Sequence, residues 1–468
     1  MKKALIFFLL IFGIIAYFAL TYFSRPSPIA INEITSTKEI GFEVTDPTRS
    51  WEIGRAKTYD YAPSVLKEDN GETKIYTCGG GLQGDAIYLT VFNNNGVKTT
   101  DSKLVLSPVV SNQQSDDAAH TCSPSVIKRS NSTIQSMVGG ALEKYLMYFE
   151  CAPKVYRRSD GVEINTFTQT CVAFSDDGIN WKKYNEDIWA SQGRFANANE
   201  PPTAVMKISS LMAQTYGIEK VSGKWWTTAM QWEVGTYGVG HPSVLVKDEQ
   251  IWLYYFNSMS ENGDQGMLLA KSDDGLHFYP PVKPTSLWAV ADVRYIAIPM
   301  LGHNGFFVSY FDKYYNYSWD GLTWQLDSNR TDNYLLGGQP SSGKCMAPGT
   351  STFGSDKYGF IHSLDVDIYT NEGYKGNNVG DWCTATNGCT CYSPLEDQSR
   401  GYTWQVYRYQ GKFTSLATPS PSPTPTPISG DLTGDGHVNI FDYNLLVSKF
   451  NNPYTIFDYN SLVANFGK

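Results

Sequence analysis

One pattern recurs along most of this 468-residue chain. Three segments share a Pro-Ser-Val core, preceded by Ala62, Ser123 and His241. Each opens a short apolar strand and is followed by a second, aromatic-rich strand, at 74–80, 145–151 and 251–256. In the second and third units a further strand runs into a Ser-Asp-Asp-Gly turn, at 175–178 and 272–275, with an aromatic residue three positions later. The first unit has a turn at 93–96 instead.

Two weaker copies bring the number of units to five. The fourth unit begins at Asp292, continues through 306–311 and ends in a turn at 318–321. The fifth unit begins at Ala347, continues through 358–364 and ends near Trp404. Such small sheets are not stable separately, whereas five arranged around an axis share one core. The repeat therefore predicts an all-β five-bladed β-propeller over residues 30–415. A β-sandwich is the alternative, because the spacing between units is uneven.

Composition supports an all-β body and excludes one class of partner. Aromatic residues make up 14% of the chain and charged residues only 18%. Aromatic side chains suit pleated strands, and they also stack on sugar rings. The formal net charge of −9 argues against nucleic acid, which requires a basic binding surface.

The two ends of the chain differ from the body. Residues 4–23 are uncharged and apolar, long enough to cross a bilayer, and two lysines precede them. We expect residues 1–24 to be a signal-anchor, with a cleaved signal peptide as the alternative. The rest of the protein would then lie at the extracellular face of the membrane or be secreted. Residues 418–427 alternate proline with serine or threonine, which predicts an extended linker over 416–429.

Eight cysteines fit an exported, disulfide-bonded protein. No two of them have the C-x-x-C spacing of zinc or redox sites. Cys151 with Cys171 and Cys78 with Cys122 are plausible pairs, although connectivity does not follow from sequence.

The segment after the linker has the spacing of a calcium-binding loop. Side chains with oxygen donors occupy loop positions 1, 3, 5, 9 and 12, and a glycine occupies position 6, where the loop turns sharply. Position 7 contributes its backbone carbonyl. The predicted calcium ligands are Asp431, Thr433, Asp435, His437, Asn439 and Asp442.

A duplication extends this C-terminal segment. The pentapeptide at 440–444 recurs at 456–460, and each copy leads into an apolar-periodic helix. A duplicated calcium loop and helix resembles type I dockerins, small all-α modules that dock onto cohesins. The resemblance covers a module at 430–468 and implies a cohesin-like partner. Because the second copy lacks most loop ligands, we expect a single calcium site.

The body has a resemblance of its own. The Pro-Ser-Val strand, the aromatic second strand and the Asp-Gly turn resemble the five-bladed propellers of family 43 glycoside hydrolases. This implies hydrolysis of O-glycosyl bonds in a polysaccharide or oligosaccharide by paired carboxyl groups. That family carries aspartates before Pro-Ser-Val in the first two units and takes a glutamate acid from the third. Here Ala62, Ser123 and His241 occupy the positions before Pro-Ser-Val.

Other carboxylates stand near the starts of the repeats. Asp60 precedes Ala62 by two residues, so regular strand alternation would place both on one face. We expect Asp60 as general base, Glu233 as general acid and Asp292 as an orienting group. The expected substrate-binding residues are His241, Trp232 and His120.

Several further acids have structural explanations. Asp116, Asp117 and Glu200 are candidates that hydrogen bonding or solvation would equally explain. Glu150 lies in a Glu-Cys-Ala-Pro segment that partly resembles the acid motif of invertases, but it ends a second strand, and we expect no catalytic role for it. The sequence thus favours an extracellular glycoside hydrolase. The alternative is a propeller that binds carbohydrate, or another surface partner, without cleaving it.

Overall fold

The computed structural model describes residues 39–54, 60–81, 84–128, 145–229, 237–259, 265–287, 292–311, 314–326, 347–356, 359–374, 403–415, 429–432, 437–450 and 456–466. One compact unit spans Ile40–Leu416, and a second contains the C-terminal helices. The expected membrane span at 4–23 and all but the last residue of the expected linker lie outside the described residues. Among the helices that are described, none has the length and apolarity to cross a membrane.

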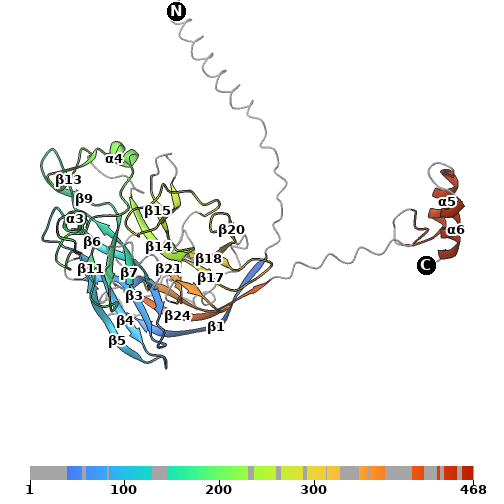
Figure 1. Ribbon diagram of the computed structural model, residues 1–468, viewed down its shortest axis with the longest axis horizontal. Helices are drawn as coiled ribbons and strands as arrows, with labels where there is room; N and C mark the ends of the chain where they lie inside the picture. Colours follow the sequence, from blue (N-terminus) through green and yellow to red (C-terminus); the bar gives the residue numbers. More distant parts are fainter. Residues whose placement is uncertain are drawn as a thin grey trace, which may run out of the picture. The chain divides into compact units, whose positions relative to one another are not determined.

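The large unit consists mainly of five sheets (Figure 1). The first contains β2 (Asp60–Lys67), β3 (Thr73–Gly81), β4 (Gly84–Phe92) and β5 (Lys98–Leu106). The second contains β6 (His120–Lys128), β7 (Tyr145–Ala152), β10 (Gln169–Ser175) and β11 (Lys182–Lys183). The third contains β14 (Val239–Lys247), β15 (Gln250–Asn257) and β16 (Gly266–Ser272).

The remaining two sheets follow in chain order. The fourth contains β17 (Asp292–Ile296), β18 (Phe306–Phe311), β19 (Tyr314–Ser318) and β20 (Trp324–Leu326), with β22 (Phe360–Ile361) added beside β17. The fifth contains β21 (Ala347–Phe353), β23 (Asp365–Tyr374), β24 (Thr403–Ser415) and β1 (Ile40–Ile53).

The first strands of the five sheets form a closed series. Neighbouring strands contact one another in the order β2, β6, β14, β17, β21 and back to β2. The serine of each Pro-Ser-Val motif accepts a hydrogen bond from the next strand in the series. The bonds run from Val126 N to Ser64 Oγ (2.9 Å), from Val244 N to Ser125 Oγ (2.9 Å) and from Val293 N to Ser243 Oγ (2.7 Å). The repeated motif therefore joins each sheet to the next.

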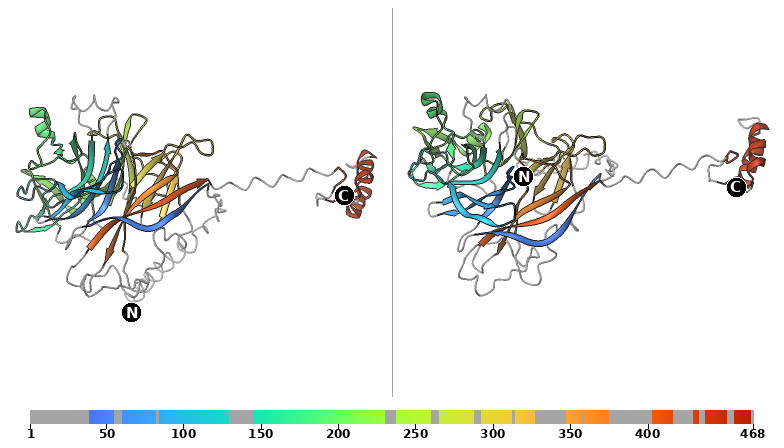
Figure 2. Two further views of the ribbon diagram at one scale, coloured as in Figure 1. Left: turned by 90° about the horizontal axis from the view of Figure 1, so that it is seen from below. Right: turned by 60° about the horizontal axis from the view of Figure 1, so that its bottom comes forward.

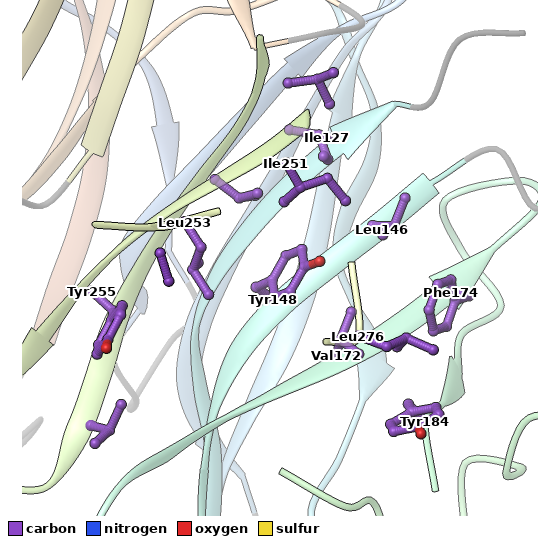
Figure 3. Packing of buried hydrophobic residues seen from close by; sticks show 14 of the residues in the cluster. Ile127, Leu146, Tyr148, Val172, Phe174, Tyr184, Ile251, Leu253, Tyr255 and Leu276 are labelled. Carbon is purple, nitrogen blue, oxygen red and sulfur yellow. The ribbon is translucent and has the colours of Figure 1, made fainter. Parts of the chain in front are cut away.

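Buried hydrophobic clusters fill the spaces between neighbouring sheets, one for each adjacent pair. Between the second and third sheets, Leu146 and Tyr148 of β7 lie close to Ile251 and Leu253 of β15 (Figure 3). Since the series of contacts closes, the sheets form a propeller-like ring. The described residues do not form the two facing sheets of a sandwich.

The Asp-Gly turns have a structural role between sheets. Gly178, Gly275 and Gly321 all have positive φ, as tight turns require. A tyrosine from the second strand of the preceding sheet donates its hydroxyl proton to each glycine carbonyl. The bonds are Tyr76 to Gly178 (2.8 Å), Tyr148 to Gly275 (2.7 Å) and Tyr254 to Gly321 (2.8 Å). The aromatic residue after the turn packs edge-on against the same tyrosine.

The fifth sheet differs from the expectation. Residues 358–364 were expected to be its second strand, but Phe360–Ile361 instead pair in parallel with β17 of the fourth sheet. The reason is packing, because Phe360 fits against Tyr295 in the cluster between the third and fourth sheets. The second and third strands of the fifth sheet are β23 and β24, and β1 pairs antiparallel with β24. Figure 2 shows β1 (blue) and β24 (orange-red) side by side.

A smaller sheet is inserted after β7. It consists of β8 (Val155–Arg157), β9 (Glu163–Asn165), β12 (Ile218–Val221) and β13 (Lys224–Thr227). Two short helices, α3 (Glu186–Gln192) and α4 (Ser210–Tyr216), lie between its two halves in the chain. The repeat did not predict this sheet, because its strands are short and follow none of the motifs.

The C-terminal unit contains two helices, α5 (Ile440–Ser448) and α6 (Ile456–Asn465). They pack through a small core of Val438, Leu446 and Leu462. Each helix begins at one copy of the repeated pentapeptide, so the sequence duplication corresponds to a duplicated helix.

Candidate functional site

The residue before each Pro-Ser-Val motif has an unusual backbone conformation. Ala62, Ser123 and His241 have φ values of 49°, 42° and 48°. At each position two residues face one on the partner strand, which defines a β-bulge. Left-handed conformations are unfavourable for residues with a Cβ, so the surrounding structure must hold them in place. Strain of this kind clusters at functional sites.

Glu150 lies beside two of these bulges. It is near the end of β7, opposite Cys122, and its residue surface is only 3% exposed. Its Oε2 accepts a hydrogen bond from Ser123 Oγ at 2.9 Å, and its Oε1 accepts one from the His241 backbone N–H at 2.6 Å. The Tyr237 hydroxyl donates to the same Oε1. One carboxylate thus joins the second and third sheets.

The environment of Glu150 keeps it ionised. Burial alone would raise the pKa of the carboxyl, but positive charge on His241 and His120, with the hydrogen bonds from Tyr237 and the His241 backbone, outweighs it. The net effect is a pKa below the ordinary value of 4.5. Glu150 is therefore a carboxylate at neutral pH and is poorly suited to donate a proton.

His241 is the accessible member of this group. Its Nδ1 lies 3.8 Å from Glu150 Oε1, and its side chain is 34% exposed. The ring stacks on Tyr237, with centroids 5.3 Å apart and planes within 11°. A partly exposed imidazole beside a buried carboxylate can carry a proton between the site and bound molecules.

A second histidine and a second carboxylate lie nearby. His120 Nδ1 is 3.9 Å from Asp85 Oδ2, and the two side chains are 24% and 22% exposed. His120 Nε2 is buried, without a hydrogen-bond partner among the residues that the structure describes. The charge of His120 also stabilises the ionised carboxylate of Glu150. We therefore treat four residues as one electrostatic cluster: Asp85, His120, Glu150 and His241.

A disulfide borders this cluster. Cys78 of β3 and Cys122 of β6 are joined, and Cys151 of β7 is joined to Cys171 of β10. These are the two pairs considered from sequence. The Tyr61 hydroxyl lies 2.8 Å from Cys122 Sγ, and an Asp85 carboxylate oxygen lies within 4.8 Å of both sulfurs of the first pair. Oxidised sulfurs do not ligate metals, so the disulfide links the first two sheets beside the site.

The expected base and orienting group, Asp60 and Asp292, are both buried and hydrogen-bonded. Asp60 is fully buried and accepts a hydrogen bond from Thr77 Oγ1 at 3.1 Å. The argument that Asp60 and Ala62 share a face was wrong, because the bulge at Ala62 interrupts strand alternation. Regular alternation holds only where the strands pair one residue to one.

Asp292 is occupied by partners on three strands. It accepts hydrogen bonds from Arg294 Nε at 2.8 Å, Phe353 N at 3.1 Å and Ser243 Oγ at 3.2 Å. Burial raises the pKa of its carboxyl, and the Arg294 charge opposes that shift. These contacts connect the third, fourth and fifth sheets, and none of them involves Glu150.

The remaining acids considered from sequence have ion-pair partners. Asp117 pairs with the buried Lys183 at 2.5 Å, and Asp116 pairs with Lys220 at 2.7 Å. Glu200 pairs with Arg194, which lowers the pKa of Glu200 to about 2. Each has an ordinary structural role. Glu233 and Trp232 lie outside the described residues.

One sequence feature drew attention to Glu150 as a candidate site residue. Its Glu-Cys-Ala-Pro segment was set aside because it ends a second strand. In the structure β7 runs next to β6, and the end of β7 that carries Glu150 lies level with the bulge at Ser123. Gly240 completes the arrangement: a Cβ there would lie 2.5 Å from Glu150 Oε1 and 2.8 Å from Tyr237 Cε1. Only glycine permits this close approach.

The described part of the calcium loop has oxygen donors. Asp442, expected at position 12, is fully buried; Oδ1 accepts from Leu432 N and Oδ2 from Asn439 N, each at 2.8 Å. Asp442 thus links the two ends of the loop. Carboxylate and amide oxygens are the donors that calcium prefers, so these residues fit such an ion. Thr433 and Asp435 lie outside the described residues.

Comparisons with known proteins give structural neighbours only. No protein-family model and no curated protein matches the chain. A family 117 glycoside hydrolase from the marine bacterium Zobellia galactanivorans is 12% identical, over 80% of this chain and 91% of its own, with a TM-score of 0.43. A GH62 hydrolase solved with xylotriose is 9% identical, over 78% and 98%, with a TM-score of 0.41.

Fructan 1-exohydrolase IIa from Cichorium intybus is 9% identical, over 77% of this chain and 57% of its own, with a TM-score of 0.40. These neighbours are glycoside hydrolases. At TM-scores this low, however, they assign neither an activity nor a substrate to this chain.

Proposed function

We propose that this chain is an extracellular or membrane-anchored glycoside hydrolase, built on a five-bladed β-propeller and acting on a polysaccharide or oligosaccharide. The observation that carries the proposal is the pairing of a buried, ionised Glu150 with the partly exposed His241. Perturbed titratable groups beside strained backbone are typical of catalytic sites.

The chemistry divides among three residues. Glycoside hydrolysis needs one group to protonate the leaving oxygen and another to activate water or attack the sugar. His241 lies 3.8 Å from the Glu150 carboxylate and donates a proton to the glycosidic oxygen. Asp85, the accessible carboxylate of the cluster, takes a proton from the water that adds to the anomeric carbon. Glu233 stays a predicted acid in the segment before Tyr237.

Hydrolysis of aryl arabinosides, xylosides and galactosides tests this proposal. Glu150→Gln, His241→Gln and Asp85→Asn are each expected to lower kcat roughly 100-fold or more, the usual effect of removing acid–base catalysis. Glu163→Gln is the matched control, because Glu163 of β9 is half-exposed and its ion-pair partner among the described residues is Lys154. Full activity in all three site variants would refute the assignment. A loss of activity in Glu233→Gln alone would instead assign the general acid to Glu233.

A binding protein without catalysis is the second candidate. It is favoured by Ala62 at the position where the family 43 pattern has a carboxylate, and by the full burial of Asp60 and Asp292 within other contacts. Retained polysaccharide affinity with no turnover of any aryl glycoside or polysaccharide would support it.

The C-terminal unit supports a docking function. Its helices expose Ile440, Phe441, Val447 and Val463, and Phe466 follows directly after α6; each is exposed by more than half. Apolar patches of this kind mark interaction surfaces. We propose that the unit binds one calcium ion and docks onto a cohesin-like protein. Calcium titration of the full chain should show one site, weakened by Asp442→Asn, and Phe441→Ala should lower cohesin affinity without changing calcium binding.

A further inference from the structure

The inserted sheet lies at the same end of the second sheet as Glu150. β8 begins three residues after the end of β7, and Figure 1 shows β9, β13 and α4 beyond one end of β6 and β7. The Lys220 ammonium and the Trp225 indole N–H both donate to Asp116 Oδ1, at 2.7 and 3.1 Å. Asp116 stands four residues before His120. The insertion is therefore attached to the segment that leads into the site.

Most cations of this sheet are neutralised by neighbouring acids. The ion pairs are Lys154 with Glu163, Arg157 with Asp160, Arg158 with Glu219 and Lys220 with Asp116. Lys224 differs, because within the described part of the chain no carboxylate lies in ion-pair distance of its ammonium group. That group lies instead 3.5 Å from the centre of the Tyr156 ring and 4.9 Å from the Trp226 ring.

This arrangement leaves a positive charge beside a partly exposed indole. Aromatic rings hold an ammonium group in position but supply no counter-charge. Trp226 lies across from Tyr156 on the paired strands β13 and β8, and both Lys224 and Trp226 are partly exposed. In a chain with a net charge of −9, a cation that no described carboxylate neutralises, fixed next to a stacking surface, suits an anionic ligand with an apolar ring face.

We propose that Lys224 and Trp226 bind an acidic sugar unit of the polysaccharide. The pyranose ring stacks on Trp226, and its carboxylate or sulfate pairs with the Lys224 ammonium group. This rests on the proposed function, and it assigns an anionic polymer to the site. A neutral glycan offers this ammonium group hydroxyl acceptors but no counter-charge.

Binding by the full chain carrying Glu150→Gln tests the proposal without turnover. Isothermal titration would compare polygalacturonate, chondroitin sulfate and neutral arabinoxylan. We expect at least one of the acidic polymers to bind more tightly than arabinoxylan, and its affinity to fall at least tenfold in Lys224→Gln and in Trp226→Ala. The preferred acidic polymer distinguishes a carboxylate from a sulfate ligand. Added salt should weaken this binding and spare any binding of arabinoxylan.

Lys207→Gln is the control, because Lys207 is exposed between α3 and α4 and has no aromatic partner among the described residues. Unchanged acidic-polymer affinity in Lys224→Gln, tighter binding of arabinoxylan, or no binding of either acidic polymer would overturn the proposal. These outcomes are separate from hydrolysis: an inactive protein that binds acidic polymer through Lys224 would overturn only the enzymatic assignment. Melting curves identify a Trp226→Ala variant that has lost its fold, in which case Lys224→Gln decides.

Discussion

The backbone N–H of His241 donates a hydrogen bond to Oε1 of Glu150 at 2.6 Å, across the boundary between the third and second sheets. The bulge before Pro242 turns this N–H toward the carboxylate. The same carboxylate accepts from Ser123 at the equivalent bulge of the second sheet. Glu150 thus connects two copies of one strained motif.

The stability of the protein should depend on Glu150 in acid. Its pKa is lowered on folding, so its contribution is present above the ordinary value of 4.5 and is lost as pH falls through the folded value. We expect the free energy of unfolding of wild type to fall below pH 4.5 more steeply than that of Glu150→Gln. Urea titrations at several pH values measure this. Parallel curves for the two proteins would contradict it.

Gly240→Ala should disrupt the site with little effect elsewhere. The new methyl group would stand 2.5 Å from Glu150 Oε1, so the carboxylate or the backbone must move. We expect a loss of hydrolysis similar to that of Glu150→Gln. Gly161→Ala is the control, because a Cβ added at Gly161 would have no atom within 4 Å. This variant therefore tests backbone strain without a steric clash. Equal activity in both variants would show that the close approach is unimportant.

The tyrosine bonds between sheets should each stabilise the fold. In Tyr254→Phe the buried carbonyl of Gly321 loses one of two donors and keeps the Trp324 indole N–H at 3.1 Å, so the loss costs about 1 kcal/mol. Thermal unfolding of Tyr254→Phe should therefore begin at a lower temperature than in wild type. Tyr279→Phe, at an exposed tyrosine whose hydroxyl donates to the partly exposed Asp273, should have little effect. A similar melting temperature for both variants and wild type would argue against a role for this bond.

The two disulfides should contribute unequally. Chain-entropy reasoning gives about 4 kcal/mol for the 44-residue separation of Cys78 and Cys122, and about 3 kcal/mol for the 20-residue separation of Cys151 and Cys171. Paired cysteine-to-serine variants, Cys78/Cys122 and Cys151/Cys171, measure each contribution by denaturant unfolding. We expect the Cys78/Cys122 variant also to lose activity, since that bond borders Asp85. An equal loss of stability with normal activity would refute both expectations.

The repeated architecture could be predicted because its chemistry is local. In the turn at Ser175, the hydroxyl oxygen accepts from Gly178 N, and Asp177 accepts from the two backbone N–H groups that follow the glycine. All of these bonds close within four residues, so the motif specifies its own shape. Its recurrence therefore predicted the second, third and fourth sheets in chain order.

The site could not be predicted in the same way. The partners of Glu150 are 27, 87 and 91 residues away along the chain. Nothing local relates Glu150 to Tyr237, and the bulges break the alternation on which the choice of Asp60 depended. His120 and His241 were singled out because they stand at repeat starts, and the structure places both beside Glu150. Only the register of β6 and β7 brings that carboxylate to them.

The pairing of β1 with β24 has a mechanical consequence. Ile40 faces Ser415, so the chain enters and leaves the five-sheet unit at neighbouring points. A force pulling the chain before Ile40 away from the chain after Ser415 would load the hydrogen bonds of this pair first and those farther along the two strands afterwards. The two strands would separate one residue pair after another, starting from Ile40 and Ser415, at low force. During this step the other four sheets and the site would carry no tension.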